Sequence, residues 1–272
     1  MVSDNLKALY EKLPSDVKLV AVSKFHPVSR LMEAYDAGQR RFGENRPQEL
    51  AQKVPQMPSD VEWHFIGHLQ TNKLKLVLPY VSLVQSVDSF HLLEAIDKWG
   101  RDNGKVVDIL LELHLGAEET KHGFSEEDIL LCCGRTPSET LRSLRDLRPS
   151  HKWAPPASRR FVSTPEAPGQ GAFALRGVPR VAQVSEGALP PLENVRIRGL
   201  MGMATNTEDE GVIEADFARI EALFKRIRAE HPELADSFTE LSIGMSGDWP
   251  IAVRHGATMV RIGTDIFGAR EY

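Results

Sequence analysis

Short apolar runs alternate with amphipathic stretches along most of this 272-residue chain, and that alternation restricts its fold more than any other feature. The runs are typical of buried β-strands. Between them, apolar side chains recur at helical spacing, as Phe217, Ile220 and Leu223 do before the seventh run. We therefore expect eight parallel strands joined by helices. The eight runs lie at residues 18–24, 41–45, 63–67, 83–87, 106–115, 195–203, 239–245 and 259–267.

Eight strand–helix repeats close most economically into a (β/α)8 barrel, and a doubly wound open sheet is the alternative. No GxGxxG motif follows the first run, which argues against a dinucleotide-binding sheet. The opening segment MVSDNLKALYEKL predicts an amphipathic helix ahead of the first strand. We predict one α/β domain over residues 1–272, a single TIM-like (β/α)8 barrel with an N-terminal helix.

One segment, residues 135–180, breaks the alternation. It holds seven of the 17 prolines, and its eight arginines and one lysine face three acidic residues. No sustained apolar period appears in it beyond a possible short helix, so it resembles a surface insertion more than part of a core. We expect an irregular insertion before the sixth strand. A basic loop that binds a partner is the less favoured interpretation.

The overall composition excludes several classes of function. The net charge is −5 and no run of about 18 apolar residues occurs, so we expect neither nucleic-acid binding nor a membrane span. The cysteines, Cys132 and Cys133, are adjacent, a spacing that suits neither a disulfide nor a metal site. The N-terminus lacks the apolar core of a signal peptide. We expect a cytoplasmic monomer without a metal site.

Polar residues gather at the carboxyl ends of the predicted strands, where TIM barrels place their chemistry. The first run ends in a lysine, and the last carries an arginine followed by a Gly-Thr pair. Met203 belongs to the same set as a packing residue at the wall of a pocket. In chain order the residues at these ends are Lys24, Asn45, His64, Ser86, His114, Met203, Ser246, Arg261, Gly263 and Thr264.

Two of these ends have the composition of a phosphate site. Ser246-Gly247-Asp248 follows the seventh run, and Gly263-Thr264 lies in the eighth. Small residues let backbone N–H groups approach a phosphate, and hydroxyl groups add further donors. The loops after strands seven and eight often bind phosphate in these barrels.

A lysine amine near a bound phosphate suggests one of two chemistries. It can form a Schiff base with pyridoxal 5′-phosphate, or it can attack a sugar phosphate as an aldolase does. Arg261 favours the first, because a guanidinium is a poor acid–base group but can donate a hydrogen bond to a pyridine nitrogen. Arg261 and Gly263 are two residues apart, so they face the same side of the last strand.

The motifs VAVSKFHP, FGENRPQEL, WHFIGHLQTNK, KHGFSEED, IRGLMGMAT and LSIGMSGDWPIAVRHGATMVRIGTDIFGAR together resemble the pyridoxal phosphate homeostasis protein family. That family is similar in fold to the N-terminal barrel domain of alanine racemase. The resemblance covers roughly residues 6–131 and 189–272, and the segment 135–180 matches nothing in it.

The resemblance implies roles for most of the strand-end residues. Lys24 would carry pyridoxal 5′-phosphate as an aldimine, and Arg261 would face the pyridine nitrogen. Ser246, Gly263 and Thr264 would hold the phosphate. Asn45 and His64 fall where the family lines its pocket. His114 stands where the family more often carries asparagine, which puts one local contact in doubt.

Three functions remain open. The leading hypothesis is a protein that binds pyridoxal 5′-phosphate for intracellular homeostasis, without catalytic residues or turnover of its own, and delivers it to pyridoxal-phosphate-dependent apoenzymes. The second is an amino-acid racemase, which needs acid–base groups on both faces of the substrate carbon. The chain ends at Tyr272, so we expect the separate domain that supplies the second base of alanine racemase to be absent. A scaffold protein acting through the basic insertion is the third.

Overall fold

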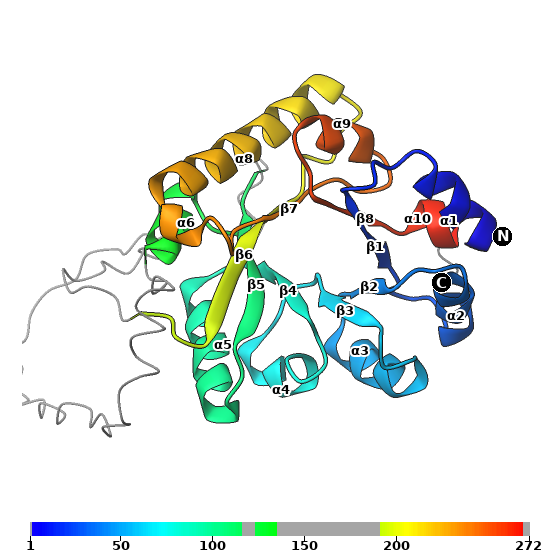
Figure 1. The fold of residues 1–272 in the computed structure, drawn as a ribbon, viewed down its shortest axis with the longest axis horizontal. Helices are drawn as coiled ribbons and strands as arrows, with labels where there is room; N and C mark the ends of the chain where they lie inside the picture. Colours follow the sequence, from blue (N-terminus) through cyan, green and yellow to red (C-terminus); the bar gives the residue numbers. More distant parts are fainter. Residues whose placement is uncertain (1, 116–122, 135–190, 269–272) are drawn as a thin grey trace, which may run out of the picture. The chain divides into compact units, whose positions relative to one another are not determined.

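Eight parallel strands form a closed barrel in the order β1-β2-β3-β4-β5-β6-β7-β8. The computed structural model describes residues 2–115, 123–134 and 191–268. The ring closes where β1 pairs with β8, from Lys18↔Met259 to Ala21↔Ile262. Seen down the barrel, the strands form the inner ring and the helices the outer one (Figure 1). The predicted (β/α)8 barrel is therefore confirmed, and the open sheet is wrong.

The strands are β1 (Lys18–Val22), β2 (Arg41–Glu44), β3 (Glu62–Phe65), β4 (Leu83–Val87), β5 (Val107–Leu113), β6 (Val195–Gly202), β7 (Glu240–Ser242) and β8 (Met259–Ile262). The α-helices are α1 (Val2–Tyr10), α2 (Val28–Asp36), α3 (Pro47–Lys53), α4 (Leu74–Val77), α5 (Phe90–Asn103), α6 (Glu126–Cys133), α8 (Glu210–Glu230), α9 (Trp249–Arg254) and α10 (Thr264–Phe267). Three short 3-10 helices lie at Val54–Gln56, Thr71–Lys73 and Pro232–Leu234.

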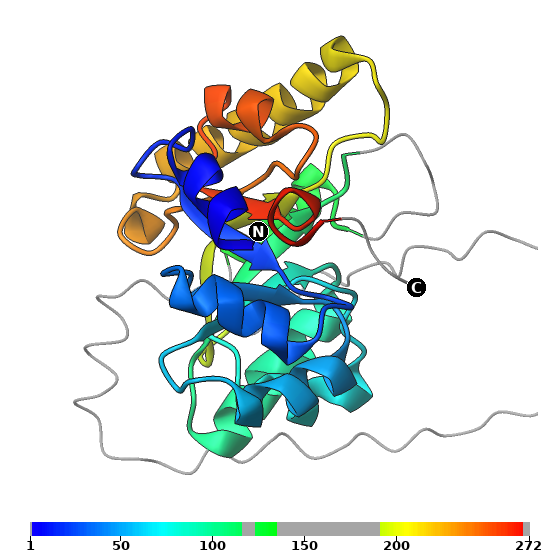
Figure 2. The same ribbon diagram turned by 90° about the vertical axis from the view of Figure 1, so that its right-hand side faces the viewer.

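The predicted N-terminal helix is α1, and it packs beside α10 at the other end of the described chain (Figure 2). The Asn5 side-chain amide donates a hydrogen bond to the Ile266 carbonyl at 3.0 Å. Val2, Leu6 and Leu9 are the buried residues of α1, so one apolar face of this helix joins the core. Among the described residues, no helix combines the length and apolar content needed to cross a membrane.

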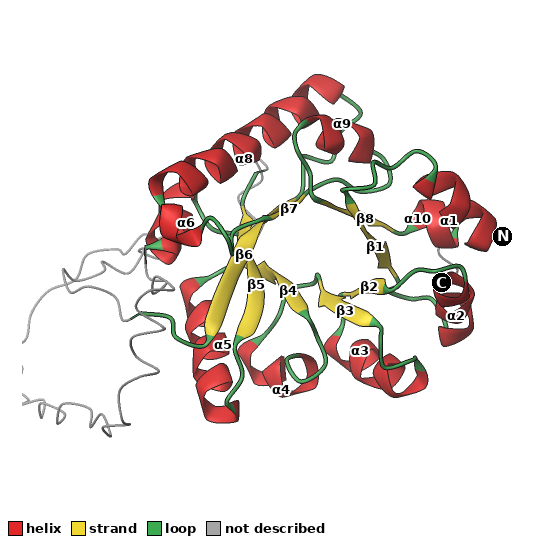
Figure 3. Cartoon of the chain, viewed as in Figure 1, coloured by secondary structure: helices red, strands yellow, loops and turns green. Residues whose placement is uncertain are grey.

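Most of the core lies between the ring of strands and the surrounding helices. Figure 3 shows the strands in yellow and the helices in red. The outward faces of the strands supply residues such as Leu19, Ile109 and Ile197 to this core. A second buried cluster fills the middle of the barrel and consists of Val20, Leu83, Leu110, Met201 and Met259. Each end of the barrel interior carries polar groups of its own, and the buried polar side chains Gln85 and Ser242 lie between the ends beside this apolar cluster.

Most predicted strands extend past the observed ones, and three of these differences bear on the site. β1 ends at Val22, so Lys24 lies in the turn that follows it. β7 covers only Glu240–Ser242. β8 ends at Ile262, and residues 264–267, predicted as strand, form the helix α10. The pairing of β8 with β1 extends no further than Ile262, so the chain is free to turn at Gly263.

All the described residues, and with them all eight strands of the barrel, belong to one unit. The predicted insertion at 135–180 lies outside the described residues.

Candidate functional site

A cavity of about 190 Å³ lies at the carboxyl ends of β1, β7 and β8. It contains five of the residues predicted from sequence, and its described lining carries two cationic side chains and no carboxylate. The lining residues are Val22, Lys24, His26, Met245, Ser246, Gly247, Arg261, Gly263, Thr264 and Gly268. The structure thus brings together the lysine, the arginine and the two small-residue loops.

The backbone turn after β1 is unusual at the residue that follows Lys24. Phe25 has φ +69°, and it is the one non-glycine residue with positive φ in the described part of the chain. A bulky side chain rarely adopts this conformation, and such strain is often found at functional sites. Lys24 is half-buried. It stands two residues after Val22, so both side chains face the same side of the chain and line the cavity.

The loop after β7 is shaped by Asp248. Its carboxylate oxygen Oδ1 accepts a hydrogen bond from the backbone N–H of Met245 at 2.5 Å, and the backbone N–H of Asp248 returns one to the Met245 carbonyl at 3.1 Å. Ser246 and Gly247 form the tip between them. A Cβ atom added to Gly247 would meet no atom within 4 Å, so the backbone there faces open space in the cavity.

Arg261 is held by several hydrogen bonds at the floor of the cavity and is only 4% exposed. Nη1 donates to the Ser242 carbonyl at 2.6 Å and to its hydroxyl at 2.8 Å, and Nη2 donates to the Gly202 carbonyl at 2.9 Å. Burial lowers the pKa of the guanidinium to about 10, opposed by the charges of Glu112 and Asp248. Arg261 therefore remains a cationic donor at neutral pH.

A chain of buried hydrogen bonds runs from Arg261 through the barrel interior. The Ser242 hydroxyl, which accepts from Arg261, donates to Gln85 Oε1 at 2.7 Å. Gln85 Nε2 lies 2.8 Å from His64 Nδ1, and since the amide nitrogen is a donor, Nδ1 is the acceptor. This chain fixes the orientation of each side chain along it.

His64, which was predicted to line the pocket, does not line this cavity. His64 lines a separate cavity of about 150 Å³ at the opposite end, together with the first residues of several strands, Lys18, Arg41 and Glu240 among them. Burial lowers the pKa of its imidazole to about 3, with smaller contributions from the charges of Arg41 and Lys18. An inward-facing residue near the start of a parallel strand points to the amino-terminal end of the barrel, and the sequence motif alone did not reveal this.

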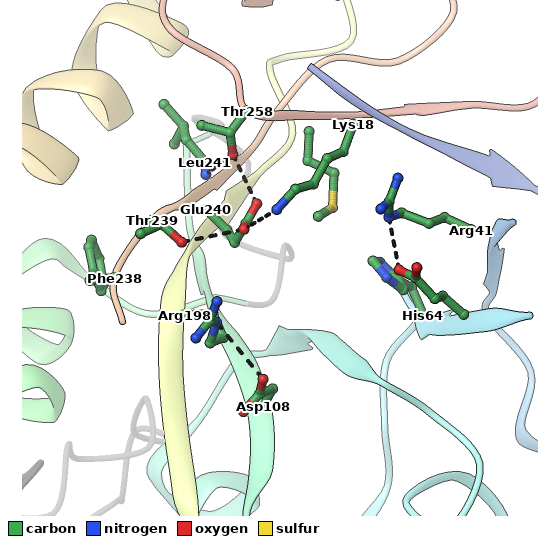
Figure 4. Close-up of polar contacts among 12 residues, drawn as sticks. Lys18, Arg41, His64, Asp108, Arg198, Phe238, Thr239, Glu240, Leu241 and Thr258 are labelled. Carbon is green, nitrogen blue, oxygen red and sulfur yellow. Dashed lines mark hydrogen bonds and ion pairs between the residues drawn. The ribbon is translucent and has the colours of Figure 1, made fainter. Parts of the chain in front are cut away.

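Ion pairs close that amino-terminal end (Figure 4). Lys18 contacts Glu240, Arg41 Nε lies 2.9 Å from Glu62, and Arg198 Nε lies 3.9 Å from Asp108. Asp108 also pairs with Arg196 at 3.1 Å, so every cation of this group faces a carboxylate. We interpret these ion pairs as a structural feature that closes the amino-terminal end of the barrel.

Asn45, Ser86 and Met203 lie around the mouth, outside the described lining of the cavity. The Ser86 hydroxyl donates to the Gly67 carbonyl at 2.5 Å, and Gly67 packs so closely on Asn45 that an added Cβ would lie 2.4 Å from its carbonyl. The side-chain oxygen of Asn45 is buried without a hydrogen-bond partner among the described residues. Met203 is 43% exposed and lines a neighbouring pocket that shares Met245 and Gly247 with the cavity.

The cavity fits a phosphorylated aldehyde such as pyridoxal 5′-phosphate. The hydroxyls of Ser246 and Thr264 and the open backbone at Gly247 suit a phosphate dianion. Lys24 offers an amine, and Arg261 offers a guanidinium donor at the floor. Two of the described lining residues are cationic and none is a carboxylate, a charge distribution that favours an anionic ligand.

Comparison with known proteins places the chain among relatives of one kind. Residues 1–142 match the family model described as alanine racemase, N-terminal domain. The chain is 30% identical over 266 residues to the pyridoxal phosphate homeostasis protein of Vibrio alginolyticus, covering 96% of this chain and 90% of that protein. It is 32% identical to the protein of the same name from Aquifex aeolicus, over 94% of this chain and 88% of that one.

The chain belongs to the pyridoxal phosphate homeostasis protein family. The resemblance found in the sequence motifs is thereby confirmed. Among solved structures, PipY of Synechococcus elongatus with pyridoxal phosphate bound is 31% identical, with a TM-score of 0.71 and coverage of 98% of this chain and 100% of that one. An alanine racemase of Clostridium difficile, 12% identical with a TM-score of 0.58, shows likeness of fold alone.

In this family member, Glu112 is the polar residue at the mouth that the sequence motifs did not single out. It lies in β5 and is 8% exposed. Burial raises the pKa of its carboxyl to about 7, the charge of Asp88 raises it further, and that of Arg261 lowers it. The signal in the sequence is a second acidic residue inside the otherwise apolar run VDILLEL. Glu112 stands at even spacing from Asp108 and Leu110, which both face the barrel interior.

Proposed function

We propose that this protein binds pyridoxal 5′-phosphate in the cavity at the carboxyl ends of the strands and holds it as a Schiff base on Lys24. The proposal rests mainly on one observation: Lys24, Arg261 and the two small-residue loops line the same cavity. No carboxylate is among the described residues that line it. The relatives' names and the pyridoxal-phosphate complex of PipY support it. The cofactor's aldehyde condenses with an amine, forming a C=N bond and releasing water.

The chain's own residues divide the binding task. Ser246, Gly263 and Thr264 hold the phosphate through hydroxyl and backbone donors, and Asp248 keeps the loop that carries Ser246 in shape. Arg261 donates to the pyridine nitrogen. Asn45, Ser86 and Met203 form the rim, where the unpartnered oxygen of Asn45 can accept a bond from the ligand or from water. His64 lies outside the cavity and is linked to it through the hydrogen-bonded chain that ends at Arg261.

We propose that the protein acts in homeostasis of the cofactor and has no turnover of its own. A guanidinium that stays charged leaves the pyridine nitrogen unprotonated, which weakens the ring as an electron sink. No tyrosine is among the described residues that line the cavity, so the second base of a racemase of the alanine type has no counterpart there.

The remaining parts of the proposal concern the cellular setting. We propose a cytoplasmic monomer, with one barrel domain over residues 1–272 interrupted at 135–180, that passes the cofactor to apoenzymes dependent on it. The half-buried position of Lys24 at an open cavity supports transfer, since the adduct stays within reach of a competing amine in solution.

An absorbance spectrum before and after borohydride reduction tests the proposal, followed by peptide mapping. Protein incubated with pyridoxal 5′-phosphate should show a Schiff-base band, and reduction should fix the label on Lys24. The Lys24→Ala variant should lose the band. Lys98→Ala should keep it, because Lys98 lies on the exposed side of α5, outside the described lining of the cavity, and pairs with Asp102 at 2.8 Å. A label on another lysine contradicts the assignment, and D-alanine formed from L-alanine by wild-type protein would favour the racemase instead.

A further inference from the structure

One buried cluster of charged side chains holds the backbone on both sides of Lys24. Lys53 Nζ donates to the Ser23 carbonyl at 2.8 Å, and Glu49 Oε1 accepts from the backbone N–H of Phe25 at 2.7 Å. The same Lys53 ammonium lies 2.7 Å from Glu44 Oε1 and 2.7 Å from Glu49 Oε1. The residues before and after Lys24 are therefore anchored to a single group of charges.

The cluster lies behind the strand ends, between β2 and α3, and away from the cavity. Side chains alternate along β1 and its extension, so Ser23 points outward while Val22 and Lys24 point toward the cavity. The Ser23 hydroxyl donates to Glu44 Oε1 at 2.6 Å. Ser23 and Glu44 are 0% exposed, and Lys53 is 5% exposed. None of the cluster's charged residues lines the cavity.

Such a cluster is a costly way to stabilise a fold. Taking charges out of water is unfavourable, and a buried ion pair often stabilises a protein no more than apolar residues of the same volume would. One Glu44 oxygen, Oε2, is buried without a hydrogen-bond partner among the described residues. The arrangement is better explained by what it does to the backbone it contacts.

What it holds is a strained turn. A φ of +69° is unfavourable for Phe25, and the hydrogen bond from its backbone N–H to Glu49 stabilises this conformation. The Arg46 guanidinium lies over the Phe25 ring, 4.4 Å from its centre, and stabilises it further. Since β1 precedes this turn and α2 follows it, a relaxation at Phe25 has to be absorbed by the backbone of Lys24, which would redirect its side chain.

We infer that Glu49, supported by Lys53 and Glu44, is a positioning residue that fixes the backbone turn around Lys24 and so aims its amine at the aldehyde in the cavity. The inference rests on the proposed function. The Glu49 cluster acts through Lys24 and touches no cofactor, so its effect is confined to the covalent step. Binding of the phosphate and ring should not depend on it.

Two substitutions separate this role from simple charge pairing. Glu49→Gln keeps an oxygen at the same reach for the Phe25 N–H but removes the charge beside Lys53. Glu49→Asp keeps the charge but shortens the side chain by one carbon. If Glu49 positions the turn, Glu49→Asp should slow Schiff-base formation. If Glu49 only pairs with the Lys53 charge, Glu49→Gln should slow it instead. Glu62→Asp serves as the matched control, because Glu62 is a partly exposed glutamate paired with Arg41 at the other end of the barrel.

The experiment measures the rate of Schiff-base formation on full-length protein by stopped-flow absorbance with pyridoxal 5′-phosphate. Glu49→Asp should form the adduct about tenfold more slowly or worse, as expected for loss of a hydrogen bond to a charged group. Glu49→Gln and Glu62→Asp should stay near the wild-type rate. Adding Phe25→Gly to Glu49→Asp should recover much of the rate, since glycine adopts a positive φ without help.

A second measurement uses pyridoxamine 5′-phosphate, which has no aldehyde and reports on the cavity alone. Its affinity should be unchanged in Glu49→Asp. An affinity that falls together with the adduct rate would show general damage to the site and overturn the inference. Equal adduct rates in all variants would also overturn the inference. The same holds if Glu49→Gln and Glu49→Asp are equally slow, or if Glu49→Gln is slow and Glu49→Asp forms the adduct at the wild-type rate. Wild-type protein that forms no adduct on Lys24 would instead overturn the proposed function and the inference with it.

Discussion

At the scale of single residues, Thr264 and Arg261 line the same cavity but differ in what a substitution removes. Thr264 is exposed at the rim, so Thr264→Val takes away one hydroxyl without disturbing the core. Losing a hydrogen bond to a charged phosphate costs about 1.5–3 kcal/mol, so the Kd for pyridoxal 5′-phosphate should rise about tenfold or more. Equilibrium dialysis measures this change.

Arg261→Gln is the companion variant. It should weaken retention of the cofactor less than Thr264→Val does, but it should lower the melting temperature more, because Ser242 and Gly202 lose their buried donor. Unchanged affinity in both variants would contradict the proposed layout of phosphate and pyridine contacts.

Glu112 should make the stability of the cofactor-free protein depend on pH. Its pKa is about 7 in the folded protein, against 4.5 in the absence of burial. The folded state therefore keeps a proton that the unfolded state loses, and the free energy of unfolding falls as pH rises from about 4.5 to 7. Glu112→Gln should remove this fall, up to about 3 kcal/mol in the difference between variant and wild type.

Urea unfolding of wild type and variant at pH 4.5, 6 and 8 measures that difference. The comparison cancels the opposite contribution of His64, whose pKa of about 3 makes stability rise with pH up to about its ordinary value of 6.5. Parallel curves for the two proteins would show that Glu112 titrates alike in both states.

Residue-level prediction from the sequence succeeded where alternation along a strand decided the matter. Arg261 and Gly263 share one face because they are two residues apart, and the structure places both in the cavity with Lys24, Ser246 and Thr264. It failed for His64, because alternation tells which residues face the barrel interior but not which end they approach. The left-handed turn at Phe25 had no signal, since no glycine marks it.

At the scale of elements, β6 contains an irregularity on which the mouth of the barrel depends. Ile109 of β5 pairs with Ile197 but Leu110 pairs with Gly199, so the register shifts by one residue at Arg198. At the shift, Arg198 faces the interior at the base, and after it Met201 does. One extra residue thus changes which side chains face inward, as a β-bulge does. Without it, Met201 would point outward.

Gly199→Ala should be strongly destabilising for this reason. Gly199 has φ +151°, and an added Cβ would lie 1.7 Å from the carbonyl oxygen of Glu240 in β7. Neither the backbone nor the neighbouring strand can move far in a closed barrel. Strain in such a conformation alone is of order 1–3 kcal/mol, and the clash adds to it. We expect little folded protein by thermal melting, whereas Gly104→Ala, with nothing within 4 Å of the added Cβ, should cost much less.

The existence and order of all eight strands were predictable from apolar runs, because a strand that is buried on both faces is a nearly continuous apolar stretch in the sequence. Strand ends were less predictable. Residues 264–267 are apolar enough to extend β8, yet they form α10, since the neighbouring strand β1 offers no pairing beyond Ala21. The same limit applies to the short strand β7, which depends on its neighbours for length.

At the scale of the whole molecule, the barrel and the cavity draw on two stretches of chain. The sequence pattern alone distinguished a regular eightfold repeat from a segment without period. All eight strands and the described lining of the cavity come from the part of the chain with the repeat. The pattern could not say what the segment without period does, because an arginine-rich composition fits several kinds of surface equally well.

Replacing residues 139–190 with a short Gly-Ser linker should therefore leave a folded barrel that still binds pyridoxal 5′-phosphate on Lys24. The unit boundary falls between α6 and β6, where a helix-to-strand connection normally needs only about 2–6 residues. Closing a long loop costs free energy that grows only slowly with its length, so its removal should change the melting temperature by a few degrees at most. Replacing α6 instead should damage the protein, because Ile129, Cys132 and Cys133 are buried there. A linker variant that fails to fold, or that loses the Schiff-base band, would show that residues 139–190 contribute to the barrel, and the proposed single domain with a dispensable insertion would be wrong.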